Sequence, residues 1–539
     1  MARDSKATRR LIPMQGRSTF MATAATVTAA AFLLTGCTTG GQASSGGTGG
    51  AMSTDTIRTA LNADPTTFNA AKANAKDDYE VARFLYDTVV RRDADGKFIG
   101  GLATEWKNTA TDATLTIRKD ATCADGTAIT PTIVAKSLSY FADPATKNNF
   151  GKLVFGPGQP TITGDDAAGT VDIKLAQPWS ELIGGLTLAQ TGIICPAGLA
   201  DLDGLAKGTV KGAFSGPYTL TKSSHGVSYD MTLREDYKAW PQWSKPLEGT
   251  PAKTVRFFPG VNKTTVANQL LTGEMDVSDI APADVQRFES NKDYAVTTVP
   301  FAGIFLLFNQ REGSPFTDPA LRKAVAQLMN QQAFNSAAYA GKGITYNSIV
   351  APTVPCVLPD NSSLTPEDAA AAKAVLAGKT FKMVGTTSIG PNGAGSTYVQ
   401  EALRAAGATV DLQLVDNGTW ATMTQTKPET WDLTVQGDAN FVGTVAASLT
   451  RIAGVPTEKG GRNIGGGENA DILADIATAQ SATDEAARCD AYTKAQKSIL
   501  SDNDIVPFVG EPQIVAQRSG FSIQAPSGIV DYATMRITK

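Results

Sequence analysis

The chain has 539 residues, of which 42% are hydrophobic, and its formal net charge at pH 7 is −4. This length supports more than one structural unit with a large core. No cluster of basic side chains occurs beyond residue 36, so the sequence lacks the electrostatic signature of a nucleic-acid-binding protein.

Residues 1–36 have the layout of a secretory signal peptide. Five basic side chains precede an uncharged apolar run of small residues from Met21 to Leu34. The run is shorter than the roughly 20 residues that a membrane-spanning helix needs, so we expect cleavage rather than a permanent span. The pair Arg9-Arg10 faintly resembles a twin-arginine signal, but Pro13 stands where an apolar residue is expected, and the general secretory route is favoured.

The apolar run ends in Leu34-Thr35-Gly36-Cys37, which resembles a bacterial lipobox. In that motif the cysteine sulfur receives a diacylglycerol group and the chain is cleaved immediately before it. Residues 38–53 are mostly Gly, Ser, Thr and Ala, which bury too little surface to offset the entropy of ordering them. We therefore expect residues 37–53 to form a lipidated cysteine with a flexible linker, which holds the protein on the extracytoplasmic face of the cell membrane.

The next part of the chain alternates strands, turns and a helix. Residues 56–71 begin with the alternation typical of a strand, and the pattern breaks at Asp64-Pro65. Apolar residues at four-residue spacing predict a helix from Tyr79 to Val90. A further alternating strand is predicted over residues 113–118.

The second half of the chain continues with clear helix starts and stops. Asp318 followed by Pro319 is typical of a helix start, residues 365–368 repeat that pattern, and Gly378 ends the alanine-rich helix that follows. Residues 381–415 then read as strand, helix, strand, which predicts a parallel α/β arrangement.

Five segments, taken in order, carry a family resemblance. They are "GGLATEW" (100–106), "CADGTAIT" (123–130), "FSGPYTLT" (214–221), "FLLFNQREGSPFTDPALRKAVAQLMNQQAF" (305–334) and "RCDAYTKAQKSILSDNDIVPF" (488–508). Together they resemble the extracytoplasmic solute-binding proteins of family 5, which are the peptide-, dipeptide- and nickel-binding proteins of ABC importers. The resemblance extends over essentially all of residues 54–539.

This resemblance implies an α/β fold of the two-lobed periplasmic-binding-protein type II, a hinged clamp with an inserted subdomain in its first lobe. The expected boundaries are lobe I at 54–90, 206–300 and 505–539, the inserted subdomain at 91–205, and lobe II at 301–504. Crossing segments near Phe301–Asn309 and Ile505–Gly510 are expected to carry the hinge.

Four cysteines besides Cys37 are present, namely Cys123, Cys195, Cys356 and Cys489. None of them forms a Cys-x-x-Cys motif, and an even number in an exported chain favours disulfides, for which three pairings are possible. The lobes implied by the resemblance favour Cys123–Cys195 with Cys356–Cys489, because each pair then stays within one lobe.

The resemblance also suggests where a ligand binds. In peptide-binding members an aspartate on a loop of the second lobe pairs with the α-amino group of the peptide. The matching region is "WDLTVQGDANFVGTVAASL" (431–449), where Asp438 is the only carboxylate after the strand and so receives that role; capping of the loop is the alternative. The family's Asp-Pro and the tryptophan just before the loop are missing here. The other candidate ligand-binding residues are Asn440, Phe441, Asp64, Pro65, Thr66, Asn309 and Arg462.

Catalytic motifs are weak by comparison. His225 is the only histidine, which excludes a multi-histidine zinc site. A Ser-His-Asp hydrolase would have to be built around this one residue. The glycine-rich segment 389–396 lacks the Gly-Lys-Ser/Thr of a P-loop and is expected to be a plain turn between a strand and a helix. We therefore expect binding rather than catalysis, without a cofactor or metal.

The sequence thus predicts a lipid-anchored, monomeric substrate-binding protein of an ABC importer. Short peptides are the expected ligand class, and the permease subunits are the expected protein partners. A non-peptide ligand such as a metal chelate or a glycoside is the alternative within the same fold, favoured by the altered loop at 431–449. An envelope enzyme is the alternative from another class.

Overall fold

The computed structural model of the protein describes residues 55–525 and 530–539. The predicted signal peptide, Cys37 and the linker all lie outside these residues. None of the helices within the described ranges is both long and apolar enough to cross a membrane.

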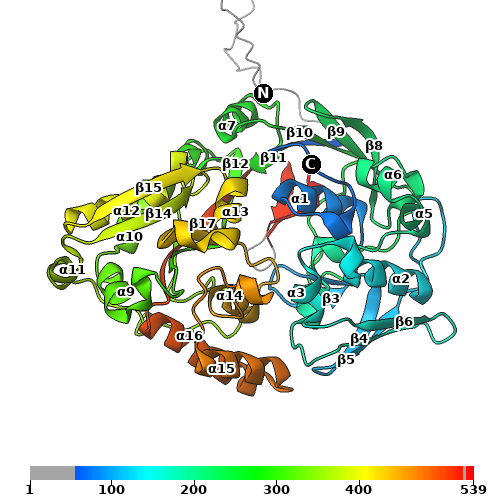
Figure 1. Ribbon diagram of the computed structural model, residues 1–539. Coiled ribbons are helices and arrows are strands. Elements are labelled where there is room, and N and C mark those ends of the chain that lie inside the picture. The colour runs from blue at the N-terminus through cyan, green and yellow to red at the C-terminus, as the bar shows by residue number, and fades with distance from the viewer. Residues whose placement is uncertain (1–54, 526–529) are drawn as a thin grey trace, which may run out of the picture. The chain divides into compact units, whose positions relative to one another are not determined.

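A mixed sheet of seven strands organises the second half of the chain (Figure 1). Its order is β11 (Val277–Asp279), β17 (Ile505–Arg518), β12 (Tyr294–Phe308), β16 (Leu433–Asp438), β14 (Thr380–Thr386) and β15 (Thr409–Val415), and β13 (Ile344–Thr345) pairs with β17. β14 is parallel to both β15 and β16, which confirms the predicted parallel strand, helix, strand unit.

Helices cover both faces of this sheet, and the sequence of β12 shows why. Ile304, Leu306 and Phe308 lie in one core, whereas Phe305 and Leu307 lie in the core on the opposite face, so the strand is apolar without interruption. The first core contains α9 (Pro319–Ala326), α10 (Gln331–Tyr339), α11 (Ala369–Leu376) and α12 (Ala394–Ala405). The second contains α13 (Asn417–Thr426), α14 (Val445–Ile452), α15 (Ala470–Ser481) and α16 (Glu485–Ser501). We call this half the second lobe.

Two four-stranded sheets organise the first half of the chain, which we call the first lobe. One has the order β1 (Thr56–Leu61), β10 (Thr254–Pro259), β9 (Ser228–Leu233), β8 (Tyr218–Ser224), and the other β4 (Ala103–Asn108), β5 (Asp112–Ile117), β7 (Thr170–Lys174), β6 (Thr161–Asp165). Smaller ladders join β2 (Val90–Arg92) to β3 (Phe98–Gly100) and β18 (Phe521–Gln524) to β19 (Asp531–Ile537). The helices are α1 (Lys76–Leu85), α2 (Pro131–Ala142), α3 (Gly151–Phe155), α4 (Leu182–Gly185), α5 (Pro196–Ala200), α6 (Leu202–Lys207), α7 (Lys263–Thr272) and α8 (Gln286–Glu289).

Helix boundaries follow local capping. Asp318 accepts a hydrogen bond from the Ala320 amide and Pro319 begins α9, as predicted. Helix α11 starts three residues later than the pattern at residues 365–368 indicates, because Asp368 is the residue whose side chain caps it. Helix α1 ends at Leu85 rather than Val90, since the β-branched run that follows enters β2.

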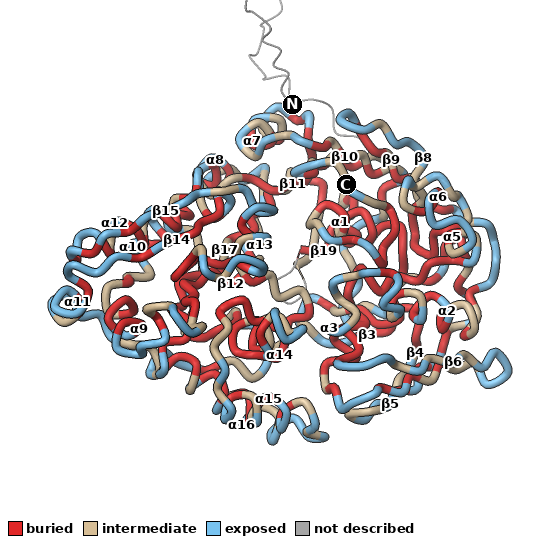
Figure 2. The backbone as a smooth tube through the Cα atoms, viewed as in Figure 1, coloured by how far each residue is buried: buried red, intermediate tan, exposed pale blue. Residues whose placement is uncertain are grey.

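The end of the chain returns to the first lobe. Tyr532, Met535 and Ile537 share a core with Val81 and Leu85 of α1. Figure 2 shows buried residues along most of β17 and throughout β19. The first lobe is therefore complete only when the C-terminal strands are in place.

Both expected disulfides are present. Cys123 is bonded to Cys195 in the first lobe, and Cys356 is bonded to Cys489 in the second. They close loops with sequence separations of 72 and 133 residues. Loops of that length correspond to about 4–5 kcal/mol each in the chain-entropy description of disulfides.

The long strands β12 and β17 pass together from one lobe to the other, and we call them the crossing strands. They are antiparallel, and their register shifts between Pro300 and Ala302, where Pro300 faces Pro512. Neither proline has a backbone N–H to donate, so the ladder loses hydrogen bonds at this point. On one side of it lie residues of the first-lobe cores, such as Ile514, and on the other residues of the second-lobe cores, such as Phe508.

Asp87 is a buried carboxylate in the first lobe, just beyond α1. It is 4% exposed, and the Tyr237 hydroxyl lies 2.9 and 2.8 Å from its two carboxylate oxygens. Burial raises its pKa to about 7, although the bond from Tyr237 and nearby arginines act in the opposite direction. The folded protein therefore holds a proton on Asp87 that the unfolded chain has released.

Replacing Asp87 with Asn tests this proton. The pKa of Asp87 is raised in the folded state, so its contribution to the free energy of unfolding of the parent falls as the pH rises from about 4 to about 7. This fall is at most about 1.4 kcal/mol per pH unit. Asp87→Asn retains an acceptor for Tyr237 and should gain stability relative to the parent across that range. Urea unfolding at several pH values measures the difference. The exposed Asp125→Asn is the control and should follow the parent, whereas parallel curves for Asp87→Asn and the parent would contradict the buried proton.

Candidate functional site

A cavity of about 70 Å³ lies between the two lobes, beside the crossing strands. One face of α1 forms a wall of it, since Lys76, Tyr79, Glu80 and Arg83 follow one another at three- and four-residue spacing. The other polar and aromatic lining residues are Gln190 of the first lobe, Phe301 and Gln513 of the crossing strands, Phe441 of the second lobe and Tyr532 of β19.

Aromatic contacts join the lobes at this cavity. Phe441, on the loop after β16, meets Tyr79 edge to face, with ring centroids 4.8 Å apart at 73°. It meets Phe301 in the same manner at 5.7 Å and 68°. Edge-to-face pairs of this kind add to the energy of apolar burial, so Phe441 is the main second-lobe contact with the cavity wall.

A polar network centred on Asp279 lies beside the aromatic contacts. Asp279 accepts hydrogen bonds from Lys76 and Tyr532, and from Gln513 at 3.2 and 3.3 Å. Burial acts to raise the pKa of Asp279, but the charge of Lys76 and these bonds outweigh burial and lower it to about 2. Burial raises the pKa of the neighbouring Glu80, whose Oε1 lies 3.1 Å from Lys76 Nζ. The positive charge of Lys76 and the negative charge of Asp279 therefore neutralise each other.

Two donors in the cavity wall have no such partners. Arg83 Nη2 donates to the Thr187 carbonyl, but Arg83 Nη1 is buried without a hydrogen-bond partner among the described residues. Gln190 is 2% exposed, and its Nε2 is likewise unpartnered within the described part of the chain. Burial raises the pKa of Tyr79, and nearby Gln190 partly offsets that shift without reaching hydrogen-bonding geometry. Both donors are available to an acceptor.

Further contacts hold the lobes together around the cavity. Arg92 Nη2 of the first lobe donates to the Val442 carbonyl at 2.7 Å. The Tyr492 hydroxyl of the second lobe donates to Glu181 Oε1 at 2.9 Å. The two lobes are therefore also in contact outside the walls of the cavity.

Asp438, predicted to bind a peptide amine, lies at the end of β16 and is 3% exposed. Ser448 donates a hydrogen bond to it, and Arg451 Nη1 lies 3.3 Å from its Oδ1. It lines a second cavity of about 20 Å³, for which Phe301 forms a shared wall with the larger one. The carboxylate therefore already has a cationic partner within its own lobe.

Asn440 lines this smaller cavity as well and closes its own loop. Its Nδ2 donates to the Thr444 carbonyl at 2.6 Å, and its Oδ1 accepts from the Gly443 amide at 2.9 Å. Phe441, the next residue, is the predicted site residue that lines the larger inter-lobe cavity.

The first-lobe candidates are placed elsewhere. Asp64 accepts hydrogen bonds from the Gly226 amide and the Tyr229 hydroxyl at 2.8 and 2.6 Å, which fastens the loop to the β8–β9 hairpin. Thr66 donates through its amide and hydroxyl to Asp78 at the start of α1. With Pro65 between them, these residues organise a turn and line neither cavity.

The remaining two candidates are also engaged within the second lobe. Asn309 is 4% exposed, and its Nδ2 donates to the carbonyls of Pro428 and Trp431 at 2.8 and 3.0 Å. Arg462 donates to the Ala447 carbonyl at 3.2 Å. Arg462 also lines a separate groove of about 530 Å³ between the lobes.

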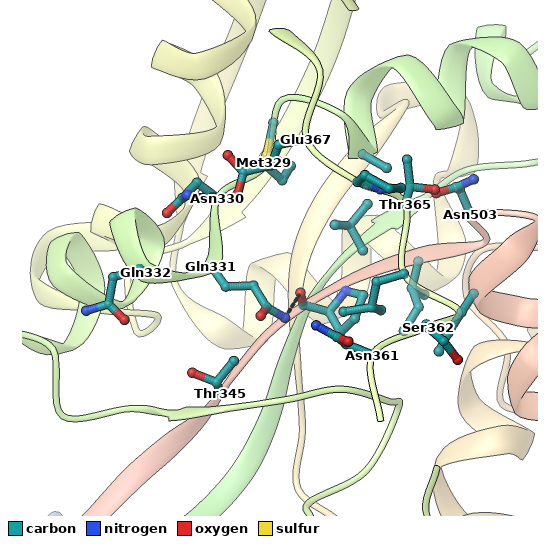
Figure 3. A pocket seen from close by; sticks show the side chains of 17 residues that line it. Met329, Asn330, Gln331, Gln332, Thr345, Asn361, Ser362, Thr365, Glu367 and Asn503 are labelled. Atoms are coloured by element: carbon teal, nitrogen blue, oxygen red, sulfur yellow. Dashed lines mark hydrogen bonds between the residues drawn. The ribbon is translucent and has the colours of Figure 1, made fainter. Parts of the chain in front are cut away.

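A hollow of about 560 Å³ within the second lobe is larger than the inter-lobe cavity (Figure 3). Two of its amide side chains are already used: Gln331 Nε2 donates to the Pro507 carbonyl at 2.9 Å, and Asn330 Nδ2 donates to Glu367 at 2.8 Å. A ligand held within one lobe makes no differential contact with open and closed arrangements of the two lobes. The cavity beside the crossing strands, which is lined from both lobes, is therefore a better candidate site than this hollow.

Sequence reasoning missed most of the lining of that cavity. Polar residues opposite an apolar stripe are typical of a solvent-exposed helix face, so the face of α1 that carries Lys76 and Arg83 gave no sign of a cavity. Gln190 and Tyr532 belong to no motif. No group of three or more His, Cys, Asp or Glu side chains suited to a metal ion occurs in residues 55–525 and 530–539.

Comparison with known proteins finds relatives of this chain in both sequence and structure. Residues 97–454 match the sequence model for bacterial extracellular solute-binding proteins, family 5 Middle. A substrate-binding protein from Microbacterium hydrocarbonoxydans, solved in complex with 4-hydroxybenzoate hydrazide, is 41% identical with a TM-score of 0.79. That similarity covers 90% of this chain and all of that chain (100%).

Two curated relatives are more distant. The periplasmic murein peptide-binding protein MppA of Escherichia coli (strain K12) is 23% identical over 286 residues, which are 50% of this chain and 52% of that protein. The glutathione-binding protein GsiB of Salmonella choleraesuis (strain SC-B67) is 22% identical over 505 residues, covering 89% and 94%. The match thus spans about half the length of the first of these relatives and nearly all of the second. The two-lobed fold expected from the sequence is confirmed by the structural similarity.

Removing Asp279 tests the polar network beside the cavity. Asp279→Asn removes one of the two carboxylates beside the largely buried Lys76 and leaves Glu80 as the other, which should lower the free energy of unfolding by about 1.5–3 kcal/mol at neutral pH. Urea unfolding measures the loss. The matched control is Asp95→Asn, which breaks an exposed pair with Lys245 and should cost at most about 1 kcal/mol. Equal losses in the two variants would show that the buried pair has no special role.

Proposed function

Because the chain belongs to the bacterial extracellular solute-binding proteins of family 5, we propose that it captures a small solute between its lobes for an ABC importer. The observation that carries the proposal is the inter-lobe cavity, whose walls come from both lobes and from the crossing strands. A ligand that touches both lobes stabilises their closed arrangement, and the permease then receives the loaded form. In this role the protein binds and releases its solute unchanged and is not an enzyme.

We infer that the moving units are those expected from the sequence: residues 54–90, 206–300 and 505–539 with the insert 91–205, against residues 301–504. The paired prolines Pro300 and Pro512 support a hinge where the crossing strands lose ladder hydrogen bonds. Because residues 505–509 lie in or beside the second-lobe cores, we place the crossing of β17 a few residues later than its first residue.

The ligand class follows from the geometry of the site. Short peptides are the class expected from the sequence, and the name of the 23% identical relative MppA supports them. Two structural observations favour a compact non-peptide solute instead. The cavity of about 70 Å³ corresponds to roughly two water molecules at about 30 Å³ each, and Asp438 is already paired with Arg451. The ligand of the 41% identical relative, an aromatic hydrazide, is likewise a non-peptide compound, and a ligand of its size requires the lobes to lie further apart than they do in this structure.

Mass spectrometry of the small molecules released when the purified protein is denatured tests this function. We expect a compact non-peptide compound, still bound by Asp438→Asn, because that variant retains an acceptor for Ser448 and changes no residue of the larger cavity. Short peptides released from the parent and lost from Asp438→Asn would instead assign the ligand class to peptides and amine pairing to Asp438. Failure to find or titrate any small ligand would contradict the receptor function itself.

We also infer that Cys37 carries the lipid that holds this receptor at the membrane. The lipobox-like Leu34-Thr35-Gly36-Cys37 and the Gly- and Ser-rich residues 38–53 support that role. A tether of about 16 residues reaches roughly 20–24 Å on average, which leaves the two lobes free to turn toward a permease in the same membrane.

Replacing Cys37 with Ser tests the anchor. We expect the variant to lose incorporation of a labelled fatty acid, because serine lacks the sulfur that receives the lipid. We also expect it to move from the membrane fraction to the soluble fraction of the cell envelope. Ligand affinity should stay within about twofold of the parent, since the described lining of the cavity comes from residues between Lys76 and Tyr532. Labelling that persists in Cys37→Ser would contradict the assignment.

A further inference from the structure

We propose that the inter-lobe cavity recognises planar acyl compounds, whose carbonyl oxygen accepts hydrogen bonds from Arg83 and Gln190 while the flat body packs against Phe441. The inference rests on the proposed function and names the chemistry of its ligand. It goes beyond the general family role because it assigns the recognition to residues that no motif marks.

The first step is the pair of unused donors. Arg83 Nη1 and Gln190 Nε2 are buried in the cavity wall and lack hydrogen-bond partners among the described residues. A buried donor without an acceptor costs free energy, about 1–3 kcal/mol for a neutral group and more for a charged one. An oxygen acceptor in the cavity removes this cost. A carbonyl or carboxylate suits two N–H donors because its oxygen has two lone pairs and no hydrogen of its own.

The second step is the charge balance around the guanidinium. Arg91 has Asp531 as its anion, and Lys76 has Asp279, but Arg83 forms no ion pair within the described residues. Burial, followed by the charge of Arg91, lowers the pKa of Arg83 to about 10, and the charge of Asp531 acts in the opposite direction. A buried cation without an ion pair of its own favours a ligand that brings either a carboxylate or the negative end of a carbonyl dipole.

The third step is the shape of the apolar walls. Tyr79 and Phe301 are both within edge-to-face distance of Phe441, so three rings enclose the space next to the donors. Arg83 and Gln190 belong to the first lobe, whereas Phe441 belongs to the second. A small opening of the clamp therefore widens the gap at Phe441 and leaves the donors in place, which suits a thin, flat molecule docked on the first lobe.

Isothermal titration calorimetry with three probes that share one ring tests the proposal. The probes are 4-hydroxybenzoate hydrazide, 4-hydroxybenzoate and 4-hydroxybenzyl alcohol, which has no carbonyl. We expect the purified protein to bind at least one acyl probe about 10- to 100-fold more tightly than the alcohol, the range of a hydrogen bond to a charged group. Tighter binding of 4-hydroxybenzoate identifies acids as the natural class, and tighter binding of the hydrazide identifies neutral acyl derivatives.

Variants then connect the effect to the two donors. Arg83→Met and Gln190→Met retain most of the side-chain length and should each weaken the preferred acyl probe about tenfold or more, with less than threefold change for the alcohol. Arg287→Met removes a first-lobe guanidinium that is paired with Asp284 outside the cavity, and it should change neither affinity. Thermal unfolding confirms that each variant is folded.

The outcomes separate this inference from the function on which it rests. Equal affinity of the unmodified protein for acyl probes and alcohol would overturn the inference without the use of any variant. Unchanged acyl affinity in both Arg83→Met and Gln190→Met would overturn it as well. If the protein binds none of the three probes but binds another small solute, the inference fails and the receptor function stands. If no small ligand of any kind binds, both fail.

Discussion

The antiparallel pairing of β12 with β17 is the constraint on which the rest of the structure depends. These strands join two lobes whose cores otherwise meet at Val442 and Ala447, and their register shifts next to the point where Pro300 faces Pro512. Phe301 and Gln513, the immediate neighbours of those prolines, both line the inter-lobe cavity. The proposed ligand site and the irregular part of the crossing strands are thus neighbours in the structure.

Polar groups around the cavity divide into two kinds with different physical roles. Asp279 has three donors and a depressed pKa, so the network with Lys76 and Tyr532 is complete without any ligand and stabilises the first lobe. Arg83 and Gln190 retain unused donors in the same wall. In the proposed receptor, Asp279 and its partners need not rearrange when a ligand forms hydrogen bonds with Arg83 and Gln190.

The parts of the structure that local patterns control were predictable, and the parts that depend on distant segments were not. The order of the motifs indicated the family and the lobes that favour the two disulfide pairs, and the local alternation of strand, helix and strand indicated the parallel unit over 381–415. The cavity combines residues 76–83, 190, 301, 441 and 513–532. Of these Phe441 was identified, because the resemblance pointed to its loop, while Asp438 beside it pairs with Arg451, a partner one helix away that spacing does not reveal.

The return of the chain to the first lobe has a consequence for the order in which the molecule matures. The second lobe is one continuous stretch, so it can complete its cores as soon as β12 to the start of β17 have been synthesised. The first lobe must wait for the last strands, and Gln513 and Tyr532 bring the final donors to Asp279. The second lobe can therefore complete its folding before the first lobe does. The cavity proposed to hold the solute is complete only after β19 has folded, because Tyr532 is part of its lining.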